Sequence, residues 1–198
     1  MDKADRHKKR MQSRKSVVDL AVAKAQDERG VLLVLTGNGK GKSSSAFGMV
    51  ARALGHDMKV AVVQFIKGAM STGEEQFFSR FPEVEFHAMG AGFTWDTQDQ
   101  SKDKATSEEG WAKALSFIND PAYELIILDE LNIVIGLGLL PLETVLSALQ
   151  NRPEHQHVVV TGRTAKQALL DIADTVTEMK DVKHAFRDGI KAQNGIEL

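Results

Sequence analysis

The chain has 198 residues, a length that fits one domain with a substantial buried core and is short for two ordinary domains. It contains no cysteine, which excludes disulfides, thiolate metal sites and cysteine nucleophiles. No segment approaches the ~18 consecutive apolar residues of a membrane-spanning helix, and the N-terminus lacks the apolar stretch of a secretion signal. We therefore expect a protein of the cytoplasm.

The formal net charge of −2 conceals a basic N-terminus. Residues 1–15 hold seven Lys and Arg against two Asp, a local charge of +5, which leaves −7 for the remainder. Such an arm can bind nucleic acid, an anionic membrane or a phosphate-bearing ligand, and it can equally be a solvated, frayed end. Because the rest of the chain is acidic, a broad nucleic-acid-binding surface is not expected.

The first predicted elements are a helix, a strand and a second helix. Residues 17–28 are rich in Val, Leu and Ala with interleaved charges, and Gly30 follows as a helix stop. Residues 31–36 form a near-continuous apolar run, typical of a strand buried on both faces of a parallel sheet. The spacing of apolar residues from Phe47 to Leu54 then predicts a helix with one apolar stripe, ending at the next glycine.

A second apolar run, residues 60–66, follows closely, so we expect a right-handed crossover between two neighbouring parallel strands. Strands and helices continue to alternate after it. The predicted strands are residues 84–87, 124–129, 157–161 and an edge strand at 176–179, and the predicted helices are residues 106–118, 142–149 and 165–173. This alternation predicts an open, doubly wound, mostly parallel α/β sheet with helices on both faces.

A glycine-rich loop joins the first predicted strand to its helix. TGNGKGKS, residues 36–43, nearly fits the phosphate-loop (P-loop) pattern G-x-x-x-x-G-K-[ST], with the first glycine one residue late. Backbone N–H groups and the helix N-terminus suit a phosphate chain, Lys42 can reach it, and Ser43 offers a hydroxyl to Mg²⁺. The predicted nucleotide-binding residues are Thr36, Gly37, Asn38, Gly39, Lys40, Gly41, Lys42, Ser43 and Ser44. The alternative is a turn that only connects strand and helix.

Two carboxylates, Asp129 and Glu130, close the predicted strand at residues 124–129. The carboxyl edge of an open α/β sheet is where ligands bind, so we expect both acids, with Ser43, to hold Mg²⁺ directly or through water. The alternative is a pair of acids at a helix start without metal. Arg163, after the strand at 157–161, can meet the phosphates or can be a surface arginine.

The loop and the acids together indicate Mg·ATP or Mg·GTP but do not name the reaction. No general base stands out, because the histidines have neither triad nor metal-ligand spacing. We expect His87, His155, His157 and His184 to be ordinary structural or exposed residues.

Several motifs, taken together, resemble the ATP:corrinoid adenosyltransferases, which attach the 5′-deoxyadenosyl group of ATP to the cobalt of a corrinoid. They are TGNGKGKSS (residues 36–44), VVQFIKG (62–68), GFTW (92–95), LDEL (128–131), TGR (161–163) and a C-terminal set with KHAF and KAQ (182–196). GFTW and the C-terminal set are what a generic nucleotide hydrolase would lack. Ser43 and Ser44 stand where the family pattern leads us to expect threonines, and serine keeps the hydroxyl.

The resemblance implies a transferase of cobalamin biosynthesis with ATP and cob(I)alamin or a related corrinoid as substrates, Mg²⁺ as cofactor and triphosphate as product. Since Co(I) is itself the nucleophile that attacks C5′, no general base is needed. Lys42, Ser43 and Glu130 are then the residues that support departure of the triphosphate. The resemblance also implies that Phe93 and Trp95 pack under the corrin and strip an axial ligand from cobalt.

By the same resemblance we expect a homodimer and a flavoprotein reductase as the electron donor. The basic arm and helix, residues 1–29, are expected to act as a lid or docking arm on a single nucleotide-binding domain, residues 30–198. Two other activities stay open at this point. A nucleic-acid-stimulated P-loop ATPase or a small-molecule kinase would release ADP instead of triphosphate.

Overall fold

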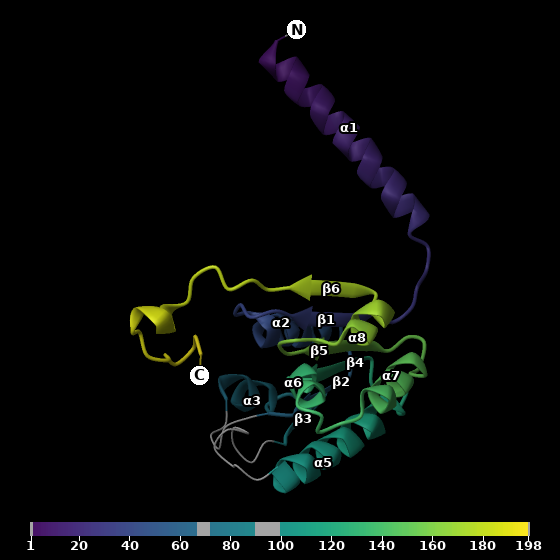
Figure 1. The fold of residues 1–198 in the computed structure, drawn as a ribbon. Helices are drawn as coiled ribbons and strands as arrows, with labels where there is room; N and C mark the ends of the chain where they lie inside the picture. Colours follow the sequence, from purple (N-terminus) through teal and green to yellow (C-terminus); the bar gives the residue numbers. More distant parts are fainter. Residues whose placement is uncertain (1, 67–71, 90–99, 198) are drawn as a thin grey trace.

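A computed structural model describes residues 2–66, 72–89 and 100–197. Its described strands form one parallel sheet in the order β3-β2-β4-β5-β1-β6 (Figure 1). The strands are β1 (Leu32–Thr36), β2 (Val60–Gln64), β3 (Val84–Ala88), β4 (Leu125–Asp129), β5 (His157–Thr161) and β6 (Thr175–Glu178). The strand order reverses direction after β3, which confirms the predicted doubly wound α/β sheet and brings all carboxyl ends to one edge.

One topological prediction is wrong. β1 and β2 are not neighbours, because β4 and β5 lie between them and β1 pairs with β5 and β6 instead. The physical reason is burial on both faces: β4 is buried at all five of its positions and β5 at four. Strands without a polar face are most stable at the centre of a sheet, where helices cover both sides.

The helices form two layers, one on each face of the sheet. They are α2 (Lys42–Leu54) and α3 (Gly73–Phe78) on one face, and α5 (Gln100–Ile118), α6 (Leu131–Gly136), α7 (Leu142–Gln150) and α8 (Gln167–Ile172) on the other. A hydrophobic core lies on each face of the sheet, and alternate residues of each central strand point into one core or the other. Ile127 packs on the α2 side, while Ile126 and Leu128 pack on the α5 side. All three are fully buried, so truncating any one to alanine should cost about 2–5 kcal/mol.

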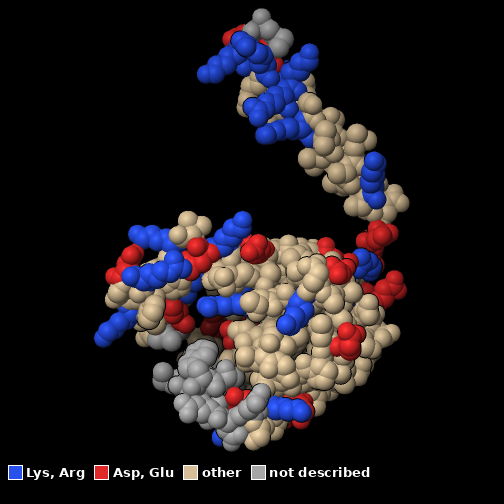
Figure 2. Space-filling view, viewed as in Figure 1, with Lys and Arg blue, Asp and Glu red and all other residues tan. Residues whose placement is uncertain are grey.

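The N-terminal helix α1 (Lys3–Lys24) differs from its prediction at both ends. It includes the basic arm, and it ends before residue 28, with Ala25 as its C-cap. None of its residues is buried, and Figure 1 shows it projecting away from the sheet. Figure 2 shows Lys and Arg gathered along its N-terminal part, whereas Val17, Val18 and Leu20 further along are exposed apolar residues.

Gly30 does not end a helix, contrary to the prediction. Its N–H donates to the Glu154 carbonyl (2.7 Å), and a Cβ at this position would lie 2.2 Å from the Gln156 carbonyl oxygen. Glycine is therefore required for a close backbone approach. Next to it, the Arg29 guanidinium bonds both Asp174 oxygens (2.5 and 3.1 Å), which ties the start of β1 to the start of β6.

The other element boundaries agree with prediction to within a few residues, with α5 extended at its N-terminal end and β2 shortened to Gln64. Three short helices were not predicted: α3, α6 and the 3₁₀ helix η1 (Ala185–Asp188). Each is too short to show an apolar period. Over the described ranges, no helix combines the length and apolar content needed to cross a bilayer.

Candidate active site

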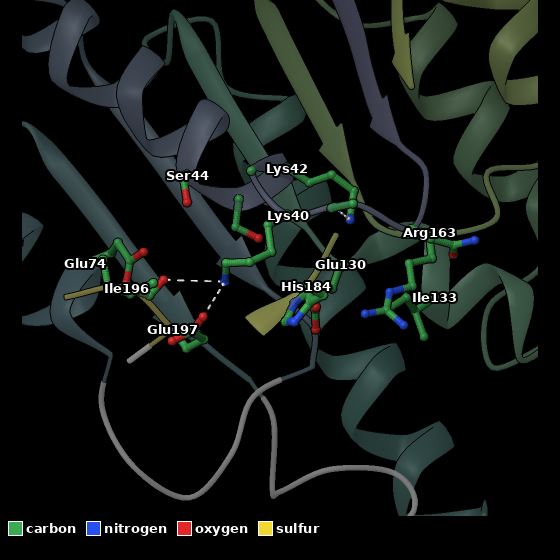
Figure 3. A pocket seen from close by; sticks show the side chains of 14 residues that line it. Lys40, Lys42, Ser44, Glu74, Glu130, Ile133, Arg163, His184, Ile196 and Glu197 are labelled. Atoms are coloured by element: carbon green, nitrogen blue, oxygen red, sulfur yellow. Dashed lines mark hydrogen bonds and ion pairs between the residues drawn. The ribbon is translucent and has the colours of Figure 1, made fainter. Parts of the chain in front are cut away.

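A cavity of about 300 Å³ lies at the carboxyl edge of the sheet, in front of the N-terminus of α2 (Figure 3). Its wall comes from the glycine-rich loop, from the segments after β4 and β5, and from the C-terminal end of the chain. The lining residues are Asn38, Gly39, Lys40, Gly41, Lys42, Ser43, Ser44, Glu74, Glu130, Ile133, Arg163, His184, Ile196 and Glu197. The structure thus brings most of the predicted nucleotide-binding residues to one cavity.

The loop is held in shape by the chain that leaves β6. Gly39 N–H donates to the Met179 carbonyl (2.7 Å), and Met179 N–H donates to the Thr36 carbonyl (2.8 Å). A Cβ on Gly39 would lie 2.5 Å from the Lys180 carbonyl oxygen. Gly41, with φ of 112°, adopts a conformation that other residues rarely take. Glycines are therefore needed both for close packing behind the loop and for its turn into α2.

Thr36 and Gly37 are not part of the cavity wall. The Thr36 hydroxyl accepts a hydrogen bond from Ala165 N–H (3.3 Å), which links the loop to the segment after β5. Gly37 has φ of 96°, and a Cβ at this position would lie 2.4 Å from the Met179 carbonyl oxygen. These two predicted binding residues position the loop in the structure.

Three cationic side chains converge on the cavity from different elements. Lys42 Nζ donates to the Gly39 carbonyl (2.6 Å), and Lys40 Nζ lies 3.4 Å from Glu197 Oε1. Arg163 has no hydrogen-bonding or ion-pair partner among the described residues. Burial lowers the pKa of Lys42, and the positive charge of Arg163 lowers it further. Cations that repel one another across a cavity indicate an anionic ligand.

The two predicted acids have different environments. Asp129 is buried below the cavity, where Gln64 Nε2 donates to its Oδ2 (2.9 Å) and the Thr161 hydroxyl donates to its Oδ1 (2.6 Å). The same Thr161 oxygen accepts from Glu130 N–H (2.9 Å). Thr161 lies on β5, the strand between β4 and β1, and thereby couples the two acids to each other.

Glu130 lines the cavity, with φ of 61°. Burial, followed by the nearby charge of Asp129, raises the pKa of its carboxyl to about 7, while Arg163 and Lys42 act in the opposite direction. No described residue donates a hydrogen bond to this carboxylate. A half-buried carboxylate without a hydrogen-bond donor is suited to a cation that the ligand brings with it.

The residues fit a magnesium ion bound together with phosphates. Ser43 and Glu130 both line the cavity, and their side chains carry the hard oxygen ligands that Mg²⁺ prefers. Among the described residues, no group of three or more His, Asp or Glu forms a complete metal cage. That sparseness is expected for Mg²⁺, which usually keeps several waters and takes further oxygens from substrate phosphates.

Sequence reasoning missed residues that enter the cavity from distant segments. Glu74 comes from α3, Ile133 from α6, and His184, Ile196 and Glu197 from the C-terminal end. His184 was expected to be an ordinary histidine, and its place within KHAF was the only sequence signal that set it apart. Phe93 and Trp95, the predicted corrinoid contacts, lie outside the described residues.

A parallel sheet with a glycine-rich loop before α2, and with cations and acids at its carboxyl edge, defines a nucleotide-binding protein of the P-loop class. Sequence comparison with known proteins identifies a family within this class. A sequence model of the family described as ATP:corrinoid adenosyltransferase BtuR/CobO/CobP matches residues 28–198. The chain belongs to this family.

Several curated relatives cover the chain almost end to end. A corrinoid adenosyltransferase of Pseudomonas aeruginosa is 62% identical over 198 residues, which is 100% of this chain and 98% of the relative. The corrinoid adenosyltransferase of Escherichia coli K12 is 48% identical over 193 residues, covering 98% of both chains. The Salmonella typhimurium relative, corrinoid adenosyltransferase CobA, has the same identity and coverage.

Proposed function

We propose that the chain binds Mg·ATP in this cavity and transfers the 5′-deoxyadenosyl group to the Co(I) of a reduced corrinoid. The electron pair of Co(I) forms the new bond to C5′, the bond between C5′ and the α-phosphate oxygen breaks, and triphosphate leaves with its electrons. One observation carries the proposal: Lys40, Lys42 and Arg163 face one cavity in a chain that is 62% identical, along its whole length, to a corrinoid adenosyltransferase.

The loop residues have the task of stabilising the departing polyphosphate. Lys42 exchanges its bond to the Gly39 carbonyl for a phosphate oxygen, and Arg163 and the loop N–H groups add further donors. Because these groups are already fixed around the cavity, little reorganisation is needed as negative charge develops on the leaving group. No residue has to remove a proton, since the nucleophile carries none.

Ser43 and Glu130 hold the magnesium ion in this proposal, and Asp129 positions Glu130 through Thr161. When bound, Mg²⁺ supplies charge neutralisation on the phosphate oxygens. The support is the fit described above: two oxygen ligands at the cavity wall, and a buried acid, Asp129, that shares the Thr161 hydroxyl with the Glu130 N–H.

We further propose that Phe93 and Trp95 pack against the corrin and displace an axial ligand, and that α1 closes over it as a lid. The support for the lid is the exposed apolar surface of α1 at Val17, Val18 and Leu20, which is suited to cover another surface. A homodimer, a flavoprotein electron donor and a cytoplasmic location remain predictions that rest on the sequence and on the family resemblance.

The activity is tested by incubating the purified chain anaerobically with ATP, Mg²⁺, hydroxocobalamin and a chemical reductant. The expected result is a change of the absorption spectrum to that of a light-sensitive adenosylcorrinoid. A reduced corrinoid that stays unchanged while the chain binds ATP normally would remove the proposal. Formation of ADP would favour the ATPase or kinase alternative.

A further inference from the structure

The C-terminal segment, residues 182–197, returns to the nucleotide cavity after the chain has left β6. It contributes His184, Ile196 and Glu197 to the cavity wall, where Ile196 and Glu197 contact Lys40 of the glycine-rich loop (Figure 3). None of the residues of η1 within it is buried, so the segment contributes little to the core. The segment instead contacts the glycine-rich loop and lines the cavity, so its side chains are placed to bind the ligand.

His184 is held by a backbone contact that settles which ring nitrogen carries the proton. It is the N-cap of η1, and its Nδ1 accepts a hydrogen bond from Phe186 N–H (3.2 Å). A ring nitrogen that accepts cannot carry a proton, so the proton of the neutral imidazole is on Nε2. No described residue accepts a hydrogen bond from that Nε2. The ring therefore presents an unused N–H donor at the cavity wall.

Glu74, Glu130 and Glu197 line this cavity along with the cations, and Glu197 lies close enough to interact electrostatically with His184. Because Glu197 is paired with Lys40 and Glu130 is the proposed Mg²⁺ ligand, the cations that remain favour an anionic acceptor for this donor. Lys42 and Arg163 enter the same cavity, and Arg163 is likewise without a partner among the described residues. Together with the Ser43 hydroxyl, these groups form a set of donors from three separate parts of the chain. A phosphate chain, with several acceptor oxygens in a row, can accept from all of them at once.

We propose that His184 is a polyphosphate-binding residue, whose Nε2–H donates to the phosphate chain of ATP and to the triphosphate that leaves. This inference rests on the proposed function, which puts the triphosphate in the cavity. It assigns the C-terminal segment a specific role: the segment lines the phosphate end of the site together with Lys42 and the glycine-rich loop. The C-terminal motif KHAF is then part of the nucleotide site.

Two substitutions separate phosphate binding from helix capping. His184→Asn keeps an acceptor near the position of Nδ1, so it can still cap η1, but it has no donor that reaches the cavity. His184→Gln keeps an N–H donor near the position of Nε2 and loses the cap. Binding of inorganic triphosphate with Mg²⁺ is measured by calorimetry for both variants and the wild type. Adenosine binding and the unfolding midpoint serve as controls for each variant.

The expected result is about tenfold weaker triphosphate binding for His184→Asn, and binding within about threefold of wild type for His184→Gln. Adenosine binding should be unchanged in both. Any other pattern overturns the inference: equal binding by all three chains means that His184 does not contact phosphate, and rescue by Asn in place of Gln means that capping alone matters. A wild-type chain that binds neither triphosphate nor ATP would instead overturn the proposed function itself.

Discussion

Lys40 Nζ lies 3.4 Å from Glu197 Oε1 and 3.5 Å from the Ile196 carbonyl oxygen, so the glycine-rich loop is joined to the C-terminal end of the chain. The other oxygen of Glu197 accepts from Gln193 N–H (3.0 Å). This backbone hydrogen bond, with help from Lys40, lowers the pKa of Glu197 and keeps the side chain ionised. The Glu197 carboxylate is therefore paired with Lys40, a loop lysine that is expected to bind phosphate.

Replacing Glu197 with Gln should tighten ATP binding, because the phosphates would no longer compete with a carboxylate for Lys40. The ion pair is partly exposed, so we expect an effect of about two- to fivefold on Kd. Calorimetry at low and at high salt measures it, and the gain should shrink as salt screens the competition. Glu143→Gln, at an exposed position in the first turn of α7, is the matched control. Unchanged or weaker ATP binding by Glu197→Gln would contradict this account.

Replacing Lys42 with Ala should reduce the rate of adenosyl transfer by at least about 10²-fold, because the negative charge that develops on the leaving triphosphate is no longer stabilised by this cation. Turnover is followed by the absorbance of the adenosylcorrinoid. Arg52→Ala serves as the control, since Arg52 is an exposed cation in the last turn of the same helix, away from the cavity. Near-normal turnover of Lys42→Ala would remove the role assigned to this lysine.

Glu130→Gln should stabilise the metal-free, nucleotide-free protein, and increasingly so as pH rises. In the folded state the carboxyl has a pKa of about 7, against 4.5 when unfolded, so the folded state binds the proton more tightly. The wild type therefore loses stability between about pH 4.5 and 7, whereas Gln carries no charge to bury. We expect a gain on the order of 1–3 kcal/mol above pH 7 that fades toward pH 4.5. Urea unfolding in EDTA measures it, and a gain independent of pH would be inconsistent with a buried charge.

Gly39→Ala should destabilise the loop, because the new Cβ would meet backbone atoms of Lys180 that cannot move aside as a side chain can. We expect a loss of about 1–3 kcal/mol of folding free energy and weaker ATP binding. Gly48→Ala is the opposite control: it lies within α2, where an added Cβ would meet no atom within 4 Å, so alanine should stabilise by up to about 1 kcal/mol. Thermal unfolding of both variants tests the pair, and equal effects would show that the contact with Lys180 is unimportant.

The sequence was informative where structure depends on local signals. β5 spans the residues that were predicted for it, and the residues from Asn38 to Ser44 lie at the cavity wall, because turn glycines and apolar runs act over a few positions. The order of the strands in the sheet could not be predicted from such local signals. The apolar runs of β1 and β2 look alike, and nothing in either one records that β4 and β5 lie between them.

The parts of the candidate site that sequence reasoning missed depend on long-range contacts. Lys40 and Ile196 are 156 positions apart, and their contact follows from the path of the chain after β6. Thr161 couples Asp129 to Glu130 only because β5 lies next to β4 in the sheet. Neither relationship leaves a pattern in the local sequence, so a single sequence could not reveal them.

In the proposed reaction, the cavity stabilises an intact triphosphate as the leaving group of adenosyl transfer. Phosphorus NMR of the products, after anaerobic reaction of the chain with ATP, Mg²⁺ and reduced cobalamin, tests it most directly. The expected products are inorganic triphosphate and the adenosylcorrinoid in equal amounts. Orthophosphate with ADP, or an adenosylcorrinoid formed without release of triphosphate, would contradict it.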